Sequence, residues 1–373
     1  MTSNSSGKRI LVIIGTRPEA IKLAPLVHAL RAEPWAQCRV LVTAQHRQLL
    51  DQMLAFFDLR PDRDLDLMQP GQSAAELAAS MIKALDPVLG NEQPDFVVAQ
   101  GDTTTAMVAA LCAYYRRIPF GHVEAGLRTG DKWRPFPEEG HRAMVATLAD
   151  LHFAPTEAAR QNLLREGIAA ARVHVVGNTV VDALLWTARR VDAARFVPRS
   201  GKKLVLVTAH RRENFGAPFA RVCAGLVAIA RRPDVELLYP VHPNPRVRDP
   251  AYAALSGCAN IILCEPLDYP DMVAAMMAST LILTDSGGIQ EEAPSLGKPV
   301  LIMRDHTERP EGVAAGIAQV VGTDAARIAT AAGAILDRAV AADTAMVHHN
   351  PYGDGNSAGA IVRVLRATLT ETA

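Results

Sequence analysis

The sequence predicts an α/β protein with two Rossmann-like, doubly wound domains that face a cleft. The length of 373 residues is typical of about two domains. Hydrophobic residues make up 49% of the chain, which is enough to fill two cores. Short apolar runs alternate with Ala- and Leu-rich amphipathic stretches from end to end. Because short buried strands separated by helices form parallel sheets with both faces covered, this alternation indicates the doubly wound class.

The first series of strands ends near Asn178. It opens at Ile10–Ile14, which Gly15 ends, and Pro18 suits the first turn of a helix that runs to about Arg31. The later strands are expected at Val40–Thr43, Phe96–Ala99, Phe120–Val123, His152–Ala154 and Val173–Val176. The helices expected between them include Ser73–Leu89, Thr103–Tyr114 and Thr156–Glu166.

A polar stretch from Arg195 to Lys203 precedes a second series of the same kind. Its strands are expected at Leu204–Thr208, Glu236–Tyr239, Ile261–Leu263, Leu281–Thr284, Val300–Ile302 and Gln319–Val321. Its helices are expected at Ala217–Arg231, Asp271–Ala278, Ile289–Ser295 and Asp324–Arg338. We therefore expect an N-terminal domain over residues 1–178 and a C-terminal domain over residues 179–354.

Composition excludes several classes of protein. The 39 basic and 39 acidic residues give no net charge, whereas nucleic-acid binders usually carry a basic excess. The start of the chain, Met1 to Arg9, lacks the apolar region of a signal peptide, and no run of about 18 apolar residues could span a membrane. The five cysteines are scattered, which is typical of reduced thiols. We expect a soluble cytoplasmic protein.

Ligands of open α/β sheets bind beyond the carboxyl ends of the strands, and the first domain has unusual residues there. The turn after the first strand contains Gly15 and Arg17, which either bind an anion or form a simple turn with a solvated arginine. Asp102 follows Phe96–Ala99 and is either a functional carboxylate or the N-cap of the next helix. Glu124 follows Phe120–Val123.

A third carboxylate, Glu138, follows two prolines and lies four residues before Arg142. On a helix the two would share a face, so an exposed ion pair is one interpretation. Crowding three carboxylates at the rim of one sheet is costly, however, and favours acid/base chemistry. His122 points to the opposite face of its strand from Glu124 and is expected to pack in the core.

The second domain offers groups that suit an anion. Leu204–Thr208 leads to His210 and two arginines, which could clamp an anion or exchange a proton. Leu281–Thr284 leads to Asp285-Ser286-Gly287-Gly288, where the glycines allow the backbone to approach a diphosphate. Glu292 follows at a distance from which it could reach a ribose diol. Together these features predict a nucleotide site.

Other common site motifs are missing from the sequence. There is no GxxxxGK[ST] phosphate loop and no GxGxxG after the first strand. There is also no HExxH or Cys/His cluster that would indicate zinc, and no GxSxG elbow.

Eight segments resemble the non-hydrolysing bacterial UDP-N-acetylglucosamine 2-epimerases. They are residues 15–22 (GTRPEAIK), 43–47 (TAQHR), 101–105 (GDTTT), 121–129 (GHVEAGLRT), 210–214 (HRREN), 284–297 (TDSGGIQEEAPSLG), 307–311 (TERPE) and 350–355 (NPYGDG). The resemblance runs from about residue 9 to the C-terminus. It implies a GT-B-like fold in which a helix over residues 355–373 returns to the first domain, and it implies a homodimer.

The resemblance also implies an activity: reversible conversion of UDP-N-acetylglucosamine (UDP-GlcNAc) to UDP-N-acetylmannosamine (UDP-ManNAc), without metal or redox cofactor. The product commonly enters polysaccharide biosynthesis. The C2 proton of the sugar is not α to a carbonyl, so UDP leaves first and 2-acetamidoglucal forms, and UDP then adds back. Two-faced proton transfer at C2 needs groups on both sides.

By resemblance, the acid/base candidates are Asp102, Glu124 and Glu138, with His210 stabilising the departing diphosphate. The residues expected to bind the UDP-sugar are Arg17, Lys22, Arg142, Leu267, Met272, Ser286, Gly287, Gly288, Glu292 and Arg309. Glu292 would bind the ribose, and Leu267 and Met272 would lie by the uracil.

The sequence departs from the family pattern at Gln100, His141 and His306, where His, Asn and Thr are usual. These changes leave open which 2-acetamido sugar is the substrate. Some relatives are activated by a second UDP-GlcNAc at the region that corresponds to Gln45–Gln48. Two other functions also fit the residues: a GT-B-type UDP-sugar glycosyltransferase, and a UDP-sugar-binding regulator without catalysis.

Overall fold

The computed structural model describes residues 7–43, 47–68, 71–198, 201–338 and 350–370. Contacts divide the chain into two compact units. Unit 1 comprises residues 1–183 and 352–373, and unit 2 comprises residues 184–351. The chain therefore passes from one unit to the other twice, at residues 183/184 and 351/352. Gln45 and His46, which belong to the region tied to activation in some relatives, lie outside the described residues.

Unit 1 is built on a parallel sheet in the order β3-β2-β1-β4-β5-β6-β7. The strands are β1 (Lys8–Ile14), β2 (Ala36–Val42), β3 (Arg63–Asp64), β4 (Phe96–Gln100), β5 (Phe120–Val123), β6 (Leu151–Ala154) and β7 (Val173–Val175). The chain moves outward from β1 to β3 and then returns to β4. The strand order thus reverses between β1 and β4, and such a switch point is where doubly wound sheets bind ligands.

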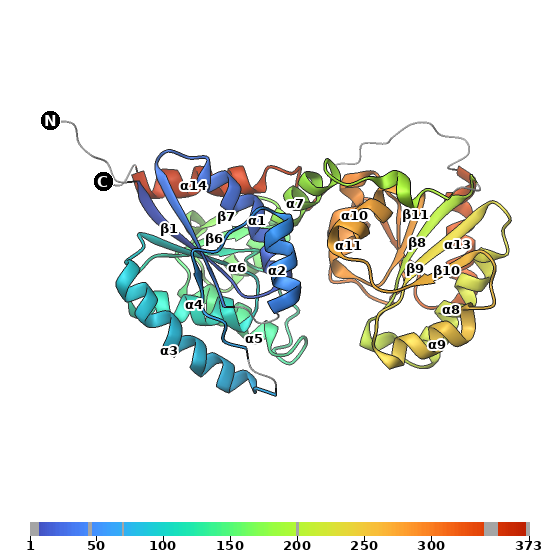
Figure 1. Cartoon of the computed structure of the whole chain (residues 1–373), viewed down its shortest axis with the longest axis horizontal. Coiled ribbons are helices and arrows are strands. Elements are labelled where there is room, and N and C mark those ends of the chain that lie inside the picture. Colours follow the sequence, from blue (N-terminus) through green and yellow to red (C-terminus); the bar gives the residue numbers. More distant parts are fainter. Residues whose placement is uncertain (1–6, 44–46, 69–70, 199–200, 339–349, 371–373) are drawn as a thin grey trace. The chain divides into compact units, whose positions relative to one another are not determined.

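Helices cover the sheet of unit 1 (Figure 1). They are α1 (Arg17–Arg31), α2 (Arg47–Phe56), α3 (Ala74–Glu92), α4 (Thr104–Tyr115), α5 (Glu138–Leu148), α6 (Glu157–Arg165) and α14 (Ser357–Thr370), whereas α7 (Thr179–Ala188) begins in unit 1 and ends in unit 2. Apolar side chains of α3, α4 and α5 form one core with alternate residues of the strands, such as Leu11 and Ile13. The C-terminal helix α14 packs against α1 (Figure 1). Its N-terminus is held by Asp182 of α7, which accepts the backbone N–H groups of Ser357 and Ala358.

Unit 2 is built on a second parallel sheet in the order β10-β9-β8-β11-β12-β13. The strands are β8 (Lys203–Thr208), β9 (Val235–Pro240), β10 (Ile261–Cys264), β11 (Leu281–Thr284), β12 (Val300–Ile302) and β13 (Ala318–Val320). The helices are α8 (Ala217–Ala230), α9 (Pro245–Leu255), α10 (Tyr269–Ala278), α11 (Gly287–Glu292), α12 (Pro310–Ala314) and α13 (Ala325–Arg338). The strand order reverses between β8 and β11.

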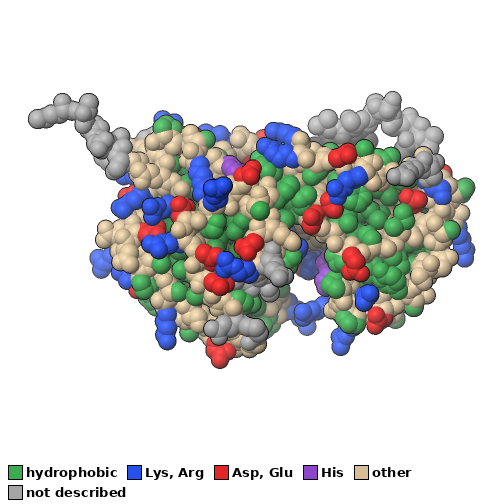
Figure 2. Space-filling model, in the orientation of Figure 1, with side chains coloured by type: hydrophobic (Ala, Val, Ile, Leu, Met, Phe, Trp, Pro, Cys, Tyr) green, Lys and Arg blue, Asp and Glu red, His purple; other side chains and the backbone are tan. Residues whose placement is uncertain are grey.

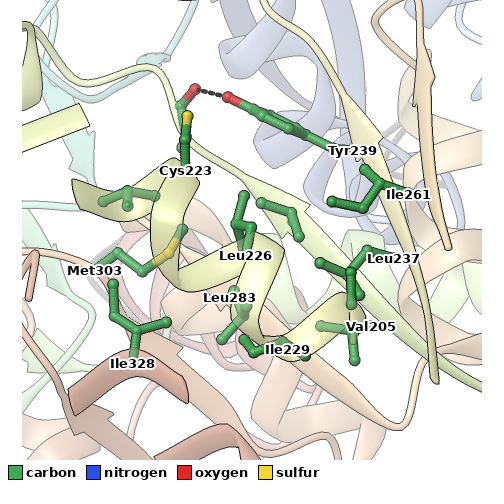
Figure 3. Close-up of a cluster of buried hydrophobic side chains, with 14 of the residues drawn as sticks. Val205, Cys223, Leu226, Ile229, Leu237, Tyr239, Ile261, Leu283, Met303 and Ile328 are labelled. Carbon is green, nitrogen blue, oxygen red and sulfur yellow. Dashed lines mark hydrogen bonds between the residues drawn. The ribbon is translucent and has the colours of Figure 1, made fainter. Parts of the chain in front are cut away.

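The two faces of the sheet in unit 2 have separate cores, because side chains alternate along each strand. Val205 and Val207 of β8 pack with α8, α9 and α13, and Figure 3 shows the centre of this core. Leu204 and Leu206 pack on the opposite face with α10 and α11. A strand that is buried on both faces has to be apolar throughout, which is why β8 was recognisable from its sequence.

The predicted fold class is confirmed: both sheets are parallel and doubly wound. Every strand predicted from sequence is present, with ends shifted by a few residues, most at β2, which begins at Ala36 and not at Val40. The two-residue strand β3 and the helices α2, α7, α9 and α12 were not predicted. Strand β3 is too short to show alternation, and α9 contains Pro250, which disguises a helical pattern.

Charged side chains show no one-sign patch on the face drawn in Figure 2, where basic and acidic groups are interspersed. This agrees with the zero net charge of the chain. Among the described helices, none is long and apolar enough to cross a membrane.

The core drawn in Figure 3 reaches the end of β8 through one buried hydroxyl group. Tyr239 is fully buried on β9, and its hydroxyl donates to the carbonyl oxygen of Ala209 at 2.8 Å. Ala209 directly precedes His210. This hydrogen bond therefore fixes the backbone from which His210 projects.

We predict that Tyr239→Phe lowers the free energy of unfolding of unit 2 by about 1–2 kcal/mol, because it removes a buried donor from a carbonyl group. Urea denaturation followed by circular dichroism measures the change. Tyr252→Phe is the matched control, since this half-buried ring packs at the edge of the same core, and we expect it to cost less than about 0.5 kcal/mol. Equal losses of unfolding free energy in the two variants would contradict the stabilising role of the Tyr239 hydroxyl group.

Candidate active site

The turn between β1 and α1 is organised by a buried carboxylate. Glu19 accepts the backbone N–H groups of Gly15 at 2.9 Å and Thr16 at 2.6 Å, and the hydroxyl of Thr103 at 2.6 Å. Burial raises the pKa of Glu19 to about 7, against the opposing effect of these hydrogen bonds. A side chain at Gly15 would overlap Thr105. The turn is thereby fixed, and Arg17 stands exposed at the first position of α1.

Asp102 follows β4 and is paired with a cation. Its Oδ2 atom lies 2.6 Å from Nη2 of Arg142 and accepts from Nε of Arg142 at 2.8 Å. The ring Nδ1 of His141 lies 2.8 Å from the Asp102 carbonyl oxygen. The N-cap of α4 is Thr103, so the alternative that Asp102 caps this helix is wrong. The carboxylate of Asp102 is therefore not used by the backbone of α4.

Glu124 lies at the end of β5, next to the end of β4. Its side chain is only 7% exposed, and Nζ of Lys22 lies 2.6 Å from Oε1. Asn178 donates its side-chain amide to the same oxygen at 2.9 Å, and Gln100 donates to Oε2. Glu124 also has a φ of +62°, in the left-handed region that non-glycine residues rarely adopt. Such strain is concentrated at functional sites. Lys22, expected to bind UDP, is here the partner of a carboxylate.

Glu138 is the first residue of α5, and its Oε2 atom is buried without a hydrogen-bond partner among the described residues. Arg142 lies one turn further along α5 but bonds to Glu139 at 2.9 Å and to Asp102. The sequence-based interpretation of an ion pair between Glu138 and Arg142 is therefore wrong. Arg142 prefers Glu139 because that carboxylate is buried and also accepts two backbone N–H groups.

His122 packs in the interior, as expected from its place on β5. It is fully buried, and Nε2 lies 2.7 Å from the carbonyl oxygen of Gly101. Burial lowers the pKa of His122 to about 4, so the ring is neutral at physiological pH. It supports the loop that carries Asp102 and has no contact that would make it an acid/base group.

The switch point of unit 2 brings together β8 and β11, which end at Thr208 and Thr284 and lead to His210 and Asp285. Asp285 is fully buried, and its carboxylate accepts the backbone N–H groups of His210 and Arg211 at 2.8 Å each. The ring of His210 is stacked on the ring of His242, with centroids 5.4 Å apart. His210 is 39% exposed and therefore accessible to a ligand.

The turn after β11 is electropositive. A Cβ atom at Gly287 would lie 3.4 Å from Nη2 of Arg211 and 3.9 Å from Nη2 of Arg309. Ser286 is the N-cap of α11, and its side chain makes no capping hydrogen bond. Glu292 ends α11 and folds back, so that its Oε1 lies 3.7 Å from a Cβ built at Gly288. Two guanidinium groups beside a glycine turn suit an anion.

The remaining candidates in unit 2 have ordinary surroundings. Leu267 and Met272 are partly buried and pack on the core beside α10. Arg309 is bonded to Glu291 through its Nε atom. His306 is exposed. No group of three or more metal-ligating side chains was found within the part of the chain that the structure describes.

Three polar residues that support these groups were given no role from the sequence, namely Glu139, Asn178 and Asp285, and Gln100 was noted only as a departure from the family pattern. Each lies at or just beyond a strand end or at a helix start, which is the only signal the sequence offers. Asp285 was within reach of prediction, because it directly precedes Ser286 and follows the strand that neighbours β8. The partners of Asn178 and Gln100 depend on the packing of segments far apart in the chain.

Comparison with known proteins identifies the family of this chain. The sequence profile of the family described as UDP-N-acetylglucosamine 2-epimerase matches residues 28–366. A UDP-N-acetylglucosamine 2-epimerase from Yersinia pestis is 51% identical over 369 residues, covering 96% of this chain and 98% of the relative.

Solved structures indicate the same family and the same fold. A UDP-GlcNAc 2-epimerase from Neisseria meningitidis bound to UDP-GlcNAc is 42% identical, with a TM-score of 0.86 and coverage of 96% of this chain and 99% of that one. A sucrose-phosphate synthase from Thermosynechococcus elongatus is 14% identical, with a TM-score of 0.65 and coverage of 98% of this chain and 100% of that one. At this low identity the likeness is evidence for a shared fold and not for a shared function. The expected GT-B-like fold is thus confirmed. The chain belongs to the UDP-N-acetylglucosamine 2-epimerase family.

Proposed function

We propose that this protein interconverts UDP-GlcNAc and UDP-ManNAc by eliminating UDP and adding it back. The observation that carries the proposal is the set of three carboxylates at or beside the rim of the sheet in unit 1. Two of them, Asp102 and Glu124, are each paired with a cation, and Glu138 has a buried oxygen that no described residue bonds. The relatives at about half identity are named for this activity.

The chemistry explains why several carboxylates are needed. When the bond between C1 and the phosphate oxygen breaks, UDP leaves with the electron pair and C1 becomes oxocarbenium-like. A base then removes the C2 proton, which gives 2-acetamidoglucal. In the return step, UDP adds to C1 while a proton is delivered to the other face of C2. The reaction has no net oxidation, and it needs proton-transfer groups on both faces.

The contacts in unit 1 support roles for its carboxylates. Glu124 accepts from Lys22, Asn178 and Gln100, so three donors hold it in one place. Asp102 is held in the same way by Arg142. The buried Oε2 atom of Glu138 has its bonding capacity left for a ligand. We infer that these three groups exchange the C2 proton.

The contacts in unit 2 support binding of the UDP part. Arg211 and Arg309 lie beside Gly287, where backbone N–H groups and guanidinium charge can meet a diphosphate. His210 stands near the same turn, since its backbone is bonded to Asp285, two residues before Gly287. We infer that His210 stabilises the charge of UDP as it departs. Glu292, Leu267 and Met272 are the proposed contacts of the ribose and the uracil, as the resemblance implies. The same resemblance adds Arg17 to the proposed UDP-binding residues.

Three further features of the proposal concern the protein in its cell. We propose a homodimer, which the exposed apolar side chains of Tyr114, Tyr115 and Met144 on unit 1 support. Sedimentation of the purified chain distinguishes the dimer from a monomer. We also propose a cytoplasmic location, which five free cysteines support, and supply of UDP-ManNAc to polysaccharide synthesis.

The activity is tested by incubating the protein with UDP-GlcNAc in D2O, without any acceptor, and following the mixture by NMR. We expect UDP-ManNAc to form and deuterium to appear at C2 of both sugars, because the C2 proton is exchanged with solvent through the carboxylates. Both sugars without label would contradict the proton-transfer mechanism. Conversion that requires an added acceptor would favour a glycosyltransferase, and binding without any conversion would favour a regulator.

The carboxylate roles are tested by Asp102→Asn, Glu124→Gln and Glu138→Gln. We expect each change to lower kcat by about 10²–10⁴-fold while UDP binding measured by calorimetry is retained, because acid/base groups contribute that much to a rate. Glu157→Gln is the control, since this exposed carboxylate on α6 is paired with Arg160 and Gln161 of its own helix, and the kcat of the variant should not change. Unchanged turnover in all three site variants would refute the assignment.

A further inference from the structure

The carboxylate of Asp285 is unusual because it is fully buried, yet its partners are almost all uncharged. Its Oδ2 atom accepts the backbone N–H groups of His210 and Arg211 at 2.8 Å each and the side-chain amide of Asn214 at 3.3 Å. In the part of the chain that the structure describes, its ion-pair partner is His210. A buried carboxylate with no Lys or Arg partner is costly, so its retention needs a reason.

The two oxygens of Asp285 have different partners. Oδ2 is saturated by three donors, whereas Oδ1 lies 3.1 Å from the backbone nitrogen of His210 and 3.7 Å from its ring Nδ1. The separation of 3.7 Å is longer than a hydrogen bond, and the attraction between carboxylate and ring is therefore electrostatic. The hydrogen bonds from the backbone N–H groups hold the Asp285 carboxylate beside the His210 ring, and they do not depend on the orientation of that ring.

Both ends of this contact are anchored to the sheet. His210 follows β8 and Asp285 follows β11, and these neighbouring strands are joined by a 2.6 Å hydrogen bond between the hydroxyls of Thr208 and Thr284. Asn214, which bonds Asp285, also donates to the carbonyl oxygen of Met303 at 3.0 Å. The carboxylate thus has a fixed position relative to the loop that carries His210.

The charged and titratable groups around His210 act in opposite directions. Burial has the largest effect and lowers the pKa of the His210 ring, Asp285 raises it, His242 and Arg211 lower it, and the net result is a pKa below the ordinary value of histidine. His242 is exposed and stacked on the ring with an interplanar angle of 19°. Asp285 is therefore the one group in this set that favours the imidazolium form.

We propose that Asp285 is a positioning residue for His210, holding its loop through the backbone and directing ring Nδ1 inward, so that Nε2 is the nitrogen that meets the ligand. The proposal rests on the proposed function, in which His210 meets the departing diphosphate. A protonated ring with Nε2–H directed at that charge would stabilise it. Asp285 itself lies buried behind the loop and acts through His210.

The test is NMR of the full-length protein with 15N-labelled histidine, using His210→Gln to assign the His210 signals among the 11 histidines. In the wild-type protein we expect neutral His210 to be the Nδ1–H tautomer, because Nδ1 faces the carboxylate. Asp285→Asn should lower the titration midpoint of His210 by about one pH unit, because an attractive charge is lost. His242→Gln should raise it, because a second ring that can become positive is lost.

Asp234→Asn is the matched control, since this carboxylate lies in unit 2 but pairs with Arg232 and Lys203, and it should leave the His210 titration unchanged. If Asp285→Asn does not fold, the tautomer of the wild-type ring still tests the proposal. The Nε2–H tautomer in the neutral wild-type ring would overturn the proposal. An unchanged midpoint in folded Asp285→Asn would also overturn it.

Kinetics separate this proposal from the proposed function. We expect Asp285→Asn to lower kcat by about ten- to a hundredfold with little change in KM, a size typical of residues that orient a catalytic group. The pH profile of kcat should move together with the His210 midpoint. If the NMR shifts occur and the profile does not move, Asp285 still positions His210, and it is the proposed role of His210 that fails.

Discussion

A buried carboxylate needs partners that compensate the water it has lost, and this constraint determines the arrangement at the switch points of both units. In unit 1, Glu124 is almost buried and is compensated by Lys22, Asn178 and Gln100. These partners lie on α1, directly before α7 and on β4. The position of the Glu124 carboxylate therefore depends on three segments of the chain. Lys22, the lysine proposed to meet the anionic ligand, is here the charged partner of this carboxylate. In unit 2, Asp285 is compensated mainly by backbone N–H groups and an amide, which leaves its charge to act on His210.

The parallel sheets explain why these groups meet. All carboxyl ends of parallel strands lie at one edge, and the reversal of strand order leaves a gap there between the flanking loops. In unit 1 the reversal lies between β1 and β4, which lead to Arg17 and Asp102. In unit 2 it lies between β8 and β11, which lead to His210 and Asp285. The two units thus share one architectural device, which carries the proposed acid/base groups in unit 1 and the proposed anion-binding groups in unit 2.

The sequence was sufficient for the fold class and for the residues at strand ends, since buried parallel strands are apolar throughout and polar residues next to them stand out. The sequence was not sufficient to predict the hydrogen-bond and ion-pair partners of these residues. Helical spacing paired Glu138 with Arg142, but the structure pairs Arg142 with Asp102, which is 40 residues away in the chain, and with buried Glu139. Asn178 and Asp285 were given no role because each resembles an ordinary loop or cap residue. What distinguishes them is a contact across the fold, and no local pattern encodes it.

The central claim is that the bond between C1 and the phosphate oxygen breaks while UDP stays bound. Positional isotope exchange tests it most directly, using UDP-GlcNAc with 18O only in the oxygen that bridges C1 and the β-phosphorus. Because the oxygens of the freed β-phosphate become equivalent by rotation, we predict that the label moves into the non-bridging positions during epimerisation. Epimerisation with the label retained in the bridge would contradict the account, because the C2 proton would then have moved without cleavage of the C1–O bond.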